Sequence, residues 1–461
     1  MASIEFWGGL DVIGSSKIVV SDGGHRVLLD IGLDIPSGAN LFRQPVRERP
    51  AHLLADRLRV GGAPRIPGLF DPAALAPGDP LADPVPGATH VFVSHPHIDH
   101  VGLAGFVRPD VPVHAHTDAV DLLTALDAAG AGLPGGDPDW QRMAAGDVVD
   151  VGPMRVECVP VDHDVPGATG YLVHTGDGTL AYTGDIRFHG RHAERSWAFA
   201  DRAAGCAVLV TEATTLSFPS SAVPRTEGEV LASFVDGLAA NGLVLLSMYP
   251  RDVERAAEFT DAARAAGRTI VWPAPDAAML RALGVPAVTW GTEDPLAGSS
   301  IDTEDPLAGS SIDTEDPLAG SSIDTEDPLA GSSIDTVTLA DVHGKPEAFV
   351  VQPDPADLPA LLDLPTADVF LHANGEPLGE FDPRWGVFTD WLAHLGIPLE
   401  RIGGWGHATP EHLHEFVERV APGVVFPVHT FEPTRLFPPG AVRRVVPRYG
   451  VTYGFDGSVR G

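Results

Sequence analysis

The sequence predicts an α/β protein, and its hydrophobic pattern supports that class in two ways. Residues 227–268 read as a helix, an apolar strand and a second helix in succession, which is the alternation of a parallel α/β unit. Other short apolar runs, such as 89–94, are bounded by glycine, proline or polar residues, as buried strands are. Several of these runs end at a histidine or an aspartate. The pattern therefore predicts a sheet that carries polar groups at its strand ends.

The other elements follow from the same reasoning. The beginning of the chain is predicted to form a hairpin, with strands at 17–20 and 26–31 around a glycine turn. Residues 45–86 are rich in proline and glycine, so we expect a long loop with short helical pieces. Further strands are predicted at 89–94, 156–161, 170–174, 179–183, 345–352, 368–371 and 424–429, and further helices at 117–129, 385–395 and 410–420.

Length and composition exclude several classes of protein. At 461 residues the chain exceeds what one hydrophobic core usually supports, so two or more lobes are expected. No apolar run approaches the ~18 residues of a membrane-spanning helix, and the start shows no secretory signal, so we expect a cytoplasmic protein without a membrane partner. Cys158 and Cys206 are the only cysteines. They exclude a disulfide framework and a thiolate-rich metal site, so any metal must be held by His, Asp and Glu.

The net charge of −33 argues against broad electrostatic attraction of nucleic acid, because an acidic surface repels phosphate groups at long range. A local basic groove can coexist with a negative total, but the sequence holds no long run of lysine and arginine. The charge therefore counts against a nucleic-acid substrate without excluding one.

A repeat occupies residues 292–335, where the unit Thr-Glu-Asp-Pro-Leu-Ala-Gly-Ser-Ser-Ile-Asp occurs in identical, consecutive copies. Each copy holds a proline and a glycine, which block a continuous helix, and few apolar groups. We expect a solvated insertion without chemistry. A small β-solenoid is the alternative interpretation.

The run His95-Pro96-His97-Ile98-Asp99-His100 gathers potential metal ligands directly after an apolar strand. Imidazoles and a carboxylate packed so tightly are poor core residues, and at a strand-to-loop corner they can converge on two neighbouring ions. A run of surface histidines is the alternative, but the buried strand before the motif and the small residues after it, which we expect to begin a helix, favour a site. One corner cannot complete two metal shells, so more ligands are expected at later strand ends.

Three later strand ends supply such ligands. His163 follows an apolar strand, Asp185 follows the next hairpin, and His429 follows the last strand. Each alone is a weak signal, because a single His or Asp after a strand is usually a turn or capping residue. Together with the first motif they predict one site. Gly184 would let the backbone before Asp185 approach closely, which suits a carboxylate that bridges two cations.

These motifs resemble those of metallo-β-lactamase-fold hydrolases of the β-CASP nuclease group, and of ribonuclease J in particular. Three further segments match signatures of that group: residues 210–215 with Glu212, residues 404–409 with His407, and residues 426–429. The likeness covers nearly the whole chain except the repeat. The family's metal motifs are matched by His95, His97, Asp99 and His100, then by His163, by Asp185 and by His429.

The resemblance implies an αββα metallo-β-lactamase sandwich with an inserted β-CASP-like α/β lobe. The sandwich would be formed by residues 1–215 and 363–461. The lobe would span residues 216–362, including the repeat at 292–335. The active site would lie in the cleft between the two.

The resemblance also implies two divalent metal ions, with zinc favoured and manganese as the alternative. Such a pair lowers the pKa of a shared water and clamps a phosphoryl oxygen. The expected catalytic residues are Asp99, His407 and Glu212. His407 would protonate the leaving group or stabilise phosphoryl oxygens, and Glu212 would orient His407. One ion would be held by His95, His97 and His163, the other by Asp99, His100 and His429, with Asp185 bridging them.

The expected function is metal-dependent phosphodiester hydrolysis with RNA as the substrate, in RNA processing or decay. Trp405 stands where ribonuclease J has a serine that helps hold a terminal phosphate, which puts recognition of a 5′-monophosphate end in question. Hydrolysis of a small ester, lactone or phosphodiester is therefore a second interpretation, and a non-catalytic metal-binding scaffold is a third. The family likeness suggests a homodimer, although we expect little room for the separate C-terminal domain of ribonuclease J.

Overall fold

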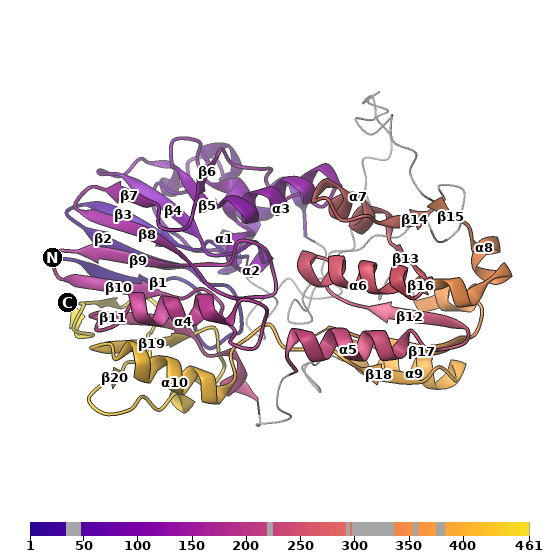
Figure 1. Ribbon diagram of the computed structural model, residues 1–461. Helices are drawn as coiled ribbons and strands as arrows, with labels where there is room; N and C mark the ends of the chain where they lie inside the picture. The colour runs from indigo at the N-terminus through magenta and orange to yellow at the C-terminus, as the bar shows by residue number, and fades with distance from the viewer. Residues whose placement is uncertain are drawn as a thin grey trace.

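Strands within the described part of the chain form three sheets, and helices cover their faces (Figure 1). The computed structural model describes residues 1–33, 48–218, 225–291, 296, 336–353, 358–374 and 383–460, with side chains from residue 385 onward in the last range. Two of the sheets lie face to face at one end of the molecule, next to both termini, and the third lies at the other end (Figure 1).

The first sheet has eight strands and is mixed. Its β1 to β3 pair antiparallel, as the predicted hairpin requires, whereas β3 to β6 pair parallel. In spatial order the strands are β22 (Val459–Arg460), β21 (Thr452–Tyr453), β1 (Ser3–Phe6), β2 (Ile18–Asp22), β3 (His25–Leu29), β4 (Thr89–Val93), β5 (Val113–His116) and β6 (Trp140–Met143).

The second sheet has seven strands. The antiparallel β7 to β10 continue into the parallel pairs β10–β11 and β11–β19. In spatial order the strands are β20 (Arg443–Arg444), β19 (Val424–Val428), β11 (Val208–Glu212), β10 (Gly178–Tyr182), β9 (Thr169–Thr175), β8 (Met154–Pro160) and β7 (Val148–Val151).

A hydrophobic core fills the space between these two sheets. The ring of Phe6 from the first sheet lies 5.1 Å from that of Phe426 in the second, between centroids. Along β4, Phe92 belongs to this inner core, whereas Val91 and Val93 belong to a core under the outer helices. A strand buried on both faces reads as a continuous apolar run, which is why the sequence shows no alternation here.

Helices cover the outer faces and complete the predicted αββα sandwich. One layer packs on the first sheet and the other, with Phe199 and Phe416 in its core, packs on the second sheet. The first layer holds α1 (Leu53–Val60), α2 (Ile98–Val101) and α3 (Thr117–Ala128), and the second holds α4 (Ala193–Arg202) and α10 (Pro410–Val420). No helix in the described ranges is long and apolar enough to cross a membrane.

The third sheet forms the inserted lobe, and all its neighbouring strands pair parallel. Apolar side chains cover both faces, as the helix–strand–helix pattern at 227–268 predicted. The strands, in spatial order, are β15 (Thr336–Val337), β14 (Val288–Trp290), β13 (Thr269–Trp272), β16 (Phe349–Val351), β12 (Leu243–Ser247), β17 (Ala367–His372) and β18 (Leu399–Arg401). The helices are α5 (Glu227–Gly237), α6 (Val253–Ala265), α7 (Ala274–Ala282), α8 (Leu339–Gly344) and α9 (Pro383–Leu395).

The lobe extends further along the chain than the sequence predicted. Strands β17 and β18 belong to the third sheet, yet both lie beyond residue 362, where the lobe was expected to end. We therefore propose that the lobe ends after Arg401 and that only the following residues return to the sandwich. The sequence does not show this, because a short buried strand reads alike in either sheet.

Two local expectations also need adjustment. The small residues after the first metal motif do not begin a long helix, because α2 is only four residues and is followed by a 3₁₀ turn at Ala104–Phe106. The repeat at 292–335 lies outside the described residues except for Leu296, which packs against the apolar core of the lobe.

Candidate metal centre

The seven predicted metal ligands come together at the strand ends of the sandwich that face the lobe. They fall into two groups, and within each group the ligand atoms lie within 4.8 Å of one another. His95 and His97 follow β4, and Asp99 and His100 lie on α2. The remaining ligands follow the ends of β8, β10 and β19, and they are His163, Asp185 and His429.

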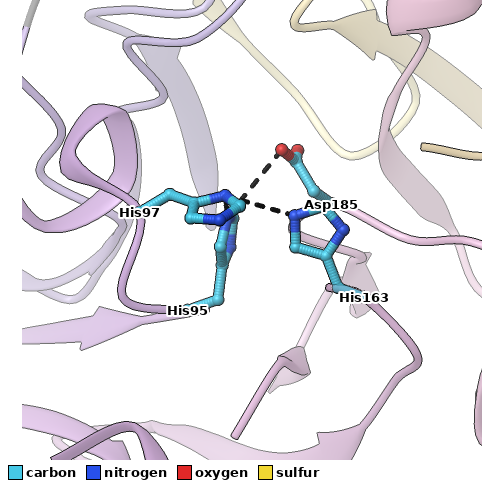
Figure 2. Close-up of side chains that lie close together, drawn as sticks. All are labelled: His95, His97, His163 and Asp185. Carbon is cyan, nitrogen blue, oxygen red and sulfur yellow. Dashed lines mark hydrogen bonds and ion pairs between the residues drawn. The ribbon is translucent and has the colours of Figure 1, made fainter. Parts of the chain in front are cut away.

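The first group consists of His95, His97, His163 and Asp185, which Figure 2 shows turned toward one point. His97 Nδ1 lies 3.0 Å from His95 Nε2 and 3.2 Å from His163 Nε2. Asp185 Oδ2 lies 3.8 Å from His95 Nε2. Three nitrogens and a carboxylate oxygen at these separations could hold one divalent ion.

The second group consists of Asp99, His100 and His429. Asp99 Oδ2 lies 3.0 Å from His429 Nε2 and 3.4 Å from His100 Nε2. Asp185 Oδ2 also faces this group, at 3.3 Å from His100 Nε2 and 3.4 Å from His429 Nε2. Asp185 Oδ2 therefore lies between the two groups.

Burial and missing hydrogen bonds indicate that these residues fit metal ions. All seven are buried. Among the described residues, His100 Nε2 and Asp185 Oδ1 are buried without a hydrogen-bond partner. Buried polar atoms normally have partners, and unpaired ones are costly, so a cluster of them calls for an additional group. A divalent cation satisfies the carboxylates and the imidazole lone pairs together.

The electrostatics of the first group favour neutral imidazoles. Burial lowers the pKa of His95 and of His163, and it lowers the pKa of His97 to about 3. A metal binds the deprotonated nitrogen, so these imidazoles are already in the form that an ion needs.

The second group is balanced differently. Burial alone would lower the pKa of His100, but the carboxylates of Asp185, Asp99 and Asp30 raise it well above its ordinary value. Burial would raise the pKa of Asp185, yet His429 and His100 beside it lower it overall. Without an ion this group is thus a network of opposite charges, and ion binding would displace the His100 proton.

A second layer of contacts fixes the orientation of four imidazoles. In each of them, the ring nitrogen that does not face the cluster lies close to an oxygen. His95 Nδ1 lies 3.0 Å from Ser94 Oγ, and His100 Nδ1 lies 2.7 Å from Asp30 Oδ2. His163 Nδ1 lies 2.6 Å from the Gly406 carbonyl oxygen, and His429 Nδ1 lies 2.8 Å from Thr214 Oγ1. Such contacts select the tautomer whose lone pair faces the metal.

Asp30 makes several hydrogen bonds at the site, and the sequence analysis did not single it out. It is fully buried. Besides His100, it accepts hydrogen bonds from Ser94 N at 2.6 Å and from the Tyr182 hydroxyl at 2.5 Å. The signal was present, because Asp30 stands at the end of an apolar strand as His163 and His429 do. Thr214 was overlooked although it lies within the motif at 210–215.

Backbone conformation at the site is unusual in the way that functional sites often are. Asp30 has φ +61° and His429 has φ +58°, a region that residues other than glycine seldom adopt. Gly184 has φ +57°, and a Cβ there would lie 2.6 Å from Ser94 Cβ. The expected close approach before Asp185 is therefore present and requires glycine.

The two predicted residues outside the metal shells also reach the centre. His407 Nδ1 lies 3.7 Å from Asp185 Oδ2 and 3.8 Å from Glu212 Oε1. Glu212 accepts hydrogen bonds from the backbone N–H groups of Thr214 and Ala408, at 2.8 and 3.1 Å. Burial would raise the pKa of Glu212, but its contacts with His407 lower it overall. Glu212 is thus an ionised, fixed carboxylate beside His407.

His407 has a second geometric option. With Asp185 and His429 it forms a third group of potential ligand atoms within 4.8 Å. The segment that carries it is held by His189, whose Nε2 donates to the Trp405 carbonyl at 2.8 Å. No role was expected for His189. Its contact is conformational, since it bonds the backbone of Trp405 and not a metal ligand.

The sandwich and the buried cluster agree with a metallo-β-lactamase fold domain, which the comparison with known families shows. Residues 65–266 match the beta-lactamase superfamily domain. The curated proteins to which the chain is similar include ribonucleases J. The chain is 27% identical over 189 residues to ribonuclease J of Mycolicibacterium smegmatis (strain ATCC 700084 / mc(2)155), covering 39% of this chain and 33% of that one. It is 22% identical over 285 residues to ribonuclease J of Pyrococcus abyssi (strain GE5 / Orsay), covering 59% of each.

The extent of these matches differs between sequences and structures. The match spans about a third of the length of the mycobacterial relatives. By contrast, the crystal structure of a protein of unknown function from Enterococcus faecalis V583 aligns over 98% of this chain and 99% of that one, with TM-score 0.75 and 25% identity. The arrangement of sandwich and lobe is thus shared with a solved protein over nearly its whole length.

Proposed function

We propose that this protein is a two-metal phosphodiesterase that cleaves RNA. The observation that carries the proposal is the position of Asp185, whose Oδ2 lies 3.8 Å from His95 Nε2 in one group and 3.3 Å from His100 Nε2 in the other. A buried carboxylate shared by two ligand groups supports a pair of ions. The curated relatives named ribonuclease J support RNA as the substrate class.

In this proposal the chain holds one ion with His95, His97 and His163, and the other with Asp99, His100 and His429. Asp185 lies between them. When bound, such a pair of ions activates water at neutral pH and neutralises charge that builds on a phosphoryl group. Asp99, besides holding an ion, would orient the attacking water through its carboxylate. The nitrogen and oxygen ligands favour Zn²⁺, with Mn²⁺ as the alternative.

His407 is the proposed proton donor to the leaving group. It is partly exposed, at 16% of its side chain, so it can meet a substrate that the buried ligands cannot. The fixed carboxylate of Glu212 would orient the imidazole and favour its protonated form. The alternative role, a ligand of the second ion beside Asp185 and His429, predicts a loss of metal when His407 is removed. The two roles are therefore separable by metal content.

Two features favour a second candidate, the hydrolysis of a small ester, lactone or phosphodiester. Trp405 replaces the serine expected at a phosphate-binding position, and the net charge of −33 opposes a polyanionic substrate. Both candidates use the same metal centre and differ in what the lobe side of the site accepts. We further propose a cytoplasmic location, with which two free, buried cysteines are compatible.

The deciding experiment offers the Zn²⁺- or Mn²⁺-loaded protein two substrates, 5′-labelled single-stranded RNA and bis-p-nitrophenyl phosphate. We expect cleavage of both, with loss of both in Asp185→Asn. Asp150→Asn, at a side chain 77% exposed on β7, is the matched control and should retain both activities. Cleavage of the small ester alone would reject RNA as the substrate and favour the second candidate.

A further inference from the structure

One imidazole of the proposed metal centre differs from the other four in how it is held. His95, His100, His163 and His429 each have the nitrogen opposite the ligand atom within hydrogen-bonding distance of an oxygen. His97 directs Nδ1 toward His95 and His163, so its outer nitrogen is Nε2. That nitrogen is buried and has no hydrogen-bond partner among the described residues.

The atom that faces His97 Nε2 is a carboxylate oxygen of Asp164, at 3.5 Å. Asp164 directly follows the ligand His163, in the loop after β8. Its Oδ1 is likewise buried without a hydrogen-bond partner in the described structure. Two unpaired buried polar atoms therefore face each other, one a donor when Nδ1 is deprotonated and the other an acceptor.

Packing holds the Asp164 carboxylate in this place. A Cβ on Gly406 would lie 2.6 Å from Asp164 Oδ2, so the backbone of the His407 segment covers the carboxylate closely. The carboxylate is thus confined beside the outer edge of His97.

We propose that Asp164 is a positioning residue for metal binding, which accepts a hydrogen bond from His97 Nε2 and so fixes the tautomer that presents Nδ1 to the ion. The inference rests on the metal centre of the proposed function. Closing the 3.5 Å gap by roughly 0.3–0.5 Å gives an ordinary charge-assisted bond, and an ion on Nδ1 would fix the ring for it. Asp164 then completes a set of outer contacts that the other four imidazoles already have.

A competing role for Asp164 is that of a direct ligand. Its Oδ1 lies 3.2 Å from His163 Nε2, a separation that two ligands of one ion could also have. The two roles differ in their dependence on His97. A positioning residue acts only while His97 is present, whereas a direct ligand binds the ion with or without it.

The test measures Co²⁺ binding to the metal-free full-length protein, by competition with a chromophoric chelator and by the visible absorption of bound Co²⁺. We expect Asp164→Ala to lower the affinity for one of the two ions by ~10–100-fold, the usual effect of losing the hydrogen-bond partner of a metal ligand. Asp164→Asn keeps a neutral acceptor and should lose less. Asp150→Ala serves as the matched control on an exposed carboxylate.

The decisive comparison is made in a His97→Ala background. There the added Asp164→Ala change should cause no further loss of affinity. Wild-type affinity in Asp164→Ala, or an equal further loss in the double variant, would overturn the positioning role. If Asp164→Ala fails to fold, Asp164→Ser, whose hydroxyl is too short to reach His97, replaces it in the same comparison. Because no RNA is used, a protein that binds both ions normally but leaves RNA intact would reject the proposed substrate and not this inference.

Discussion

Arg187 Nη1 donates to Glu227 Oε1 at 2.8 Å, and this buried ion pair joins the sandwich to the inserted lobe. Arg187 follows Asp185 by two residues, and Glu227 is the first residue of α5 in the lobe. Arg255 and Arg191 also contact Glu227, at 2.6 and 3.0 Å. The carboxylate of Glu227 thus contacts three guanidinium groups and connects the loop of Asp185 to the lobe.

We predict that Glu227→Gln destabilises the protein by about 3–5 kcal/mol, because removing one partner leaves buried charges without compensation. The loss should appear as a lower urea midpoint. Glu194→Gln, at a side chain 73% exposed, is the control and should change stability by less than about 1 kcal/mol. Equal midpoints for wild type and Glu227→Gln would show that the cluster does not hold the lobe to the sandwich.

The same pair has a predictable pH dependence. Burial would raise the pKa of Glu227, but Arg255, Arg187 and Arg191 lower it overall, from 4.5 to about 2. Because the folded pKa is the lower one, the stabilisation is complete above pH 4.5 and is lost as pH falls toward 2. The gap in urea midpoint between wild type and Glu227→Gln should therefore be constant near pH 7 and shrink below pH 4.5. A gap that widens with acid would contradict the assignment.

His407→Ala should keep both metals and lose roughly 10²–10⁴-fold in turnover of RNA, the range for a positioned acid. Glu212→Gln should lose less, since it acts through His407. With bis-p-nitrophenyl phosphate the loss should be smaller, because nitrophenolate leaves without a proton. Loss of a metal ion in His407→Ala, measured by elemental analysis, would instead identify the ligand role that its position beside Asp185 and His429 allows.

Most of the repeat should be dispensable for stability. Strands β14 and β15 pair parallel on either side of it, so the chain still needs a crossover between them. Replacing residues 297–335 by a Gly/Ser linker of about 12 residues, with Leu296 kept, should leave the melting temperature nearly unchanged, since loop-closure cost varies slowly with length. The same linker with Leu296→Ala is the comparison for the contact of Leu296 with the lobe core. A drop of many degrees in the first variant would show that the repeat packs.

The family resemblance of the motifs implied the sandwich, and the pattern of polar residues after apolar runs selected residues that the structure brings together. His95, His163, Asp185 and His429 all follow apolar runs, and strand ends of neighbouring strands meet at one edge of a sheet. That regularity is local in sequence and therefore readable. The helix bounds Pro410–Val420 were predicted for the same reason, since Thr409 caps a strongly amphipathic segment.

The features that the sequence did not predict depend on contacts between distant segments. The hydrogen bond from Tyr182 to Asp30 spans 152 residues, and the one between His163 and the Gly406 carbonyl spans 243. Neither leaves a local pattern. The sequence did not place β17 and β18 in the third sheet, because a short buried strand carries no local feature that shows which sheet it joins. The contact between Asp164 and His97 likewise depends on how the loop folds, so the sequence does not show it.

The most direct test of the account is the metal content of the folded protein. Purified protein supplied with Zn²⁺ or Mn²⁺ should hold close to two ions per chain by elemental analysis, because seven buried residues form two ligand groups with Asp185 Oδ2 between them. Asp185→Ala should lose at least one ion while circular dichroism shows that it remains folded. A folded wild type that takes up neither ion would contradict the central claim.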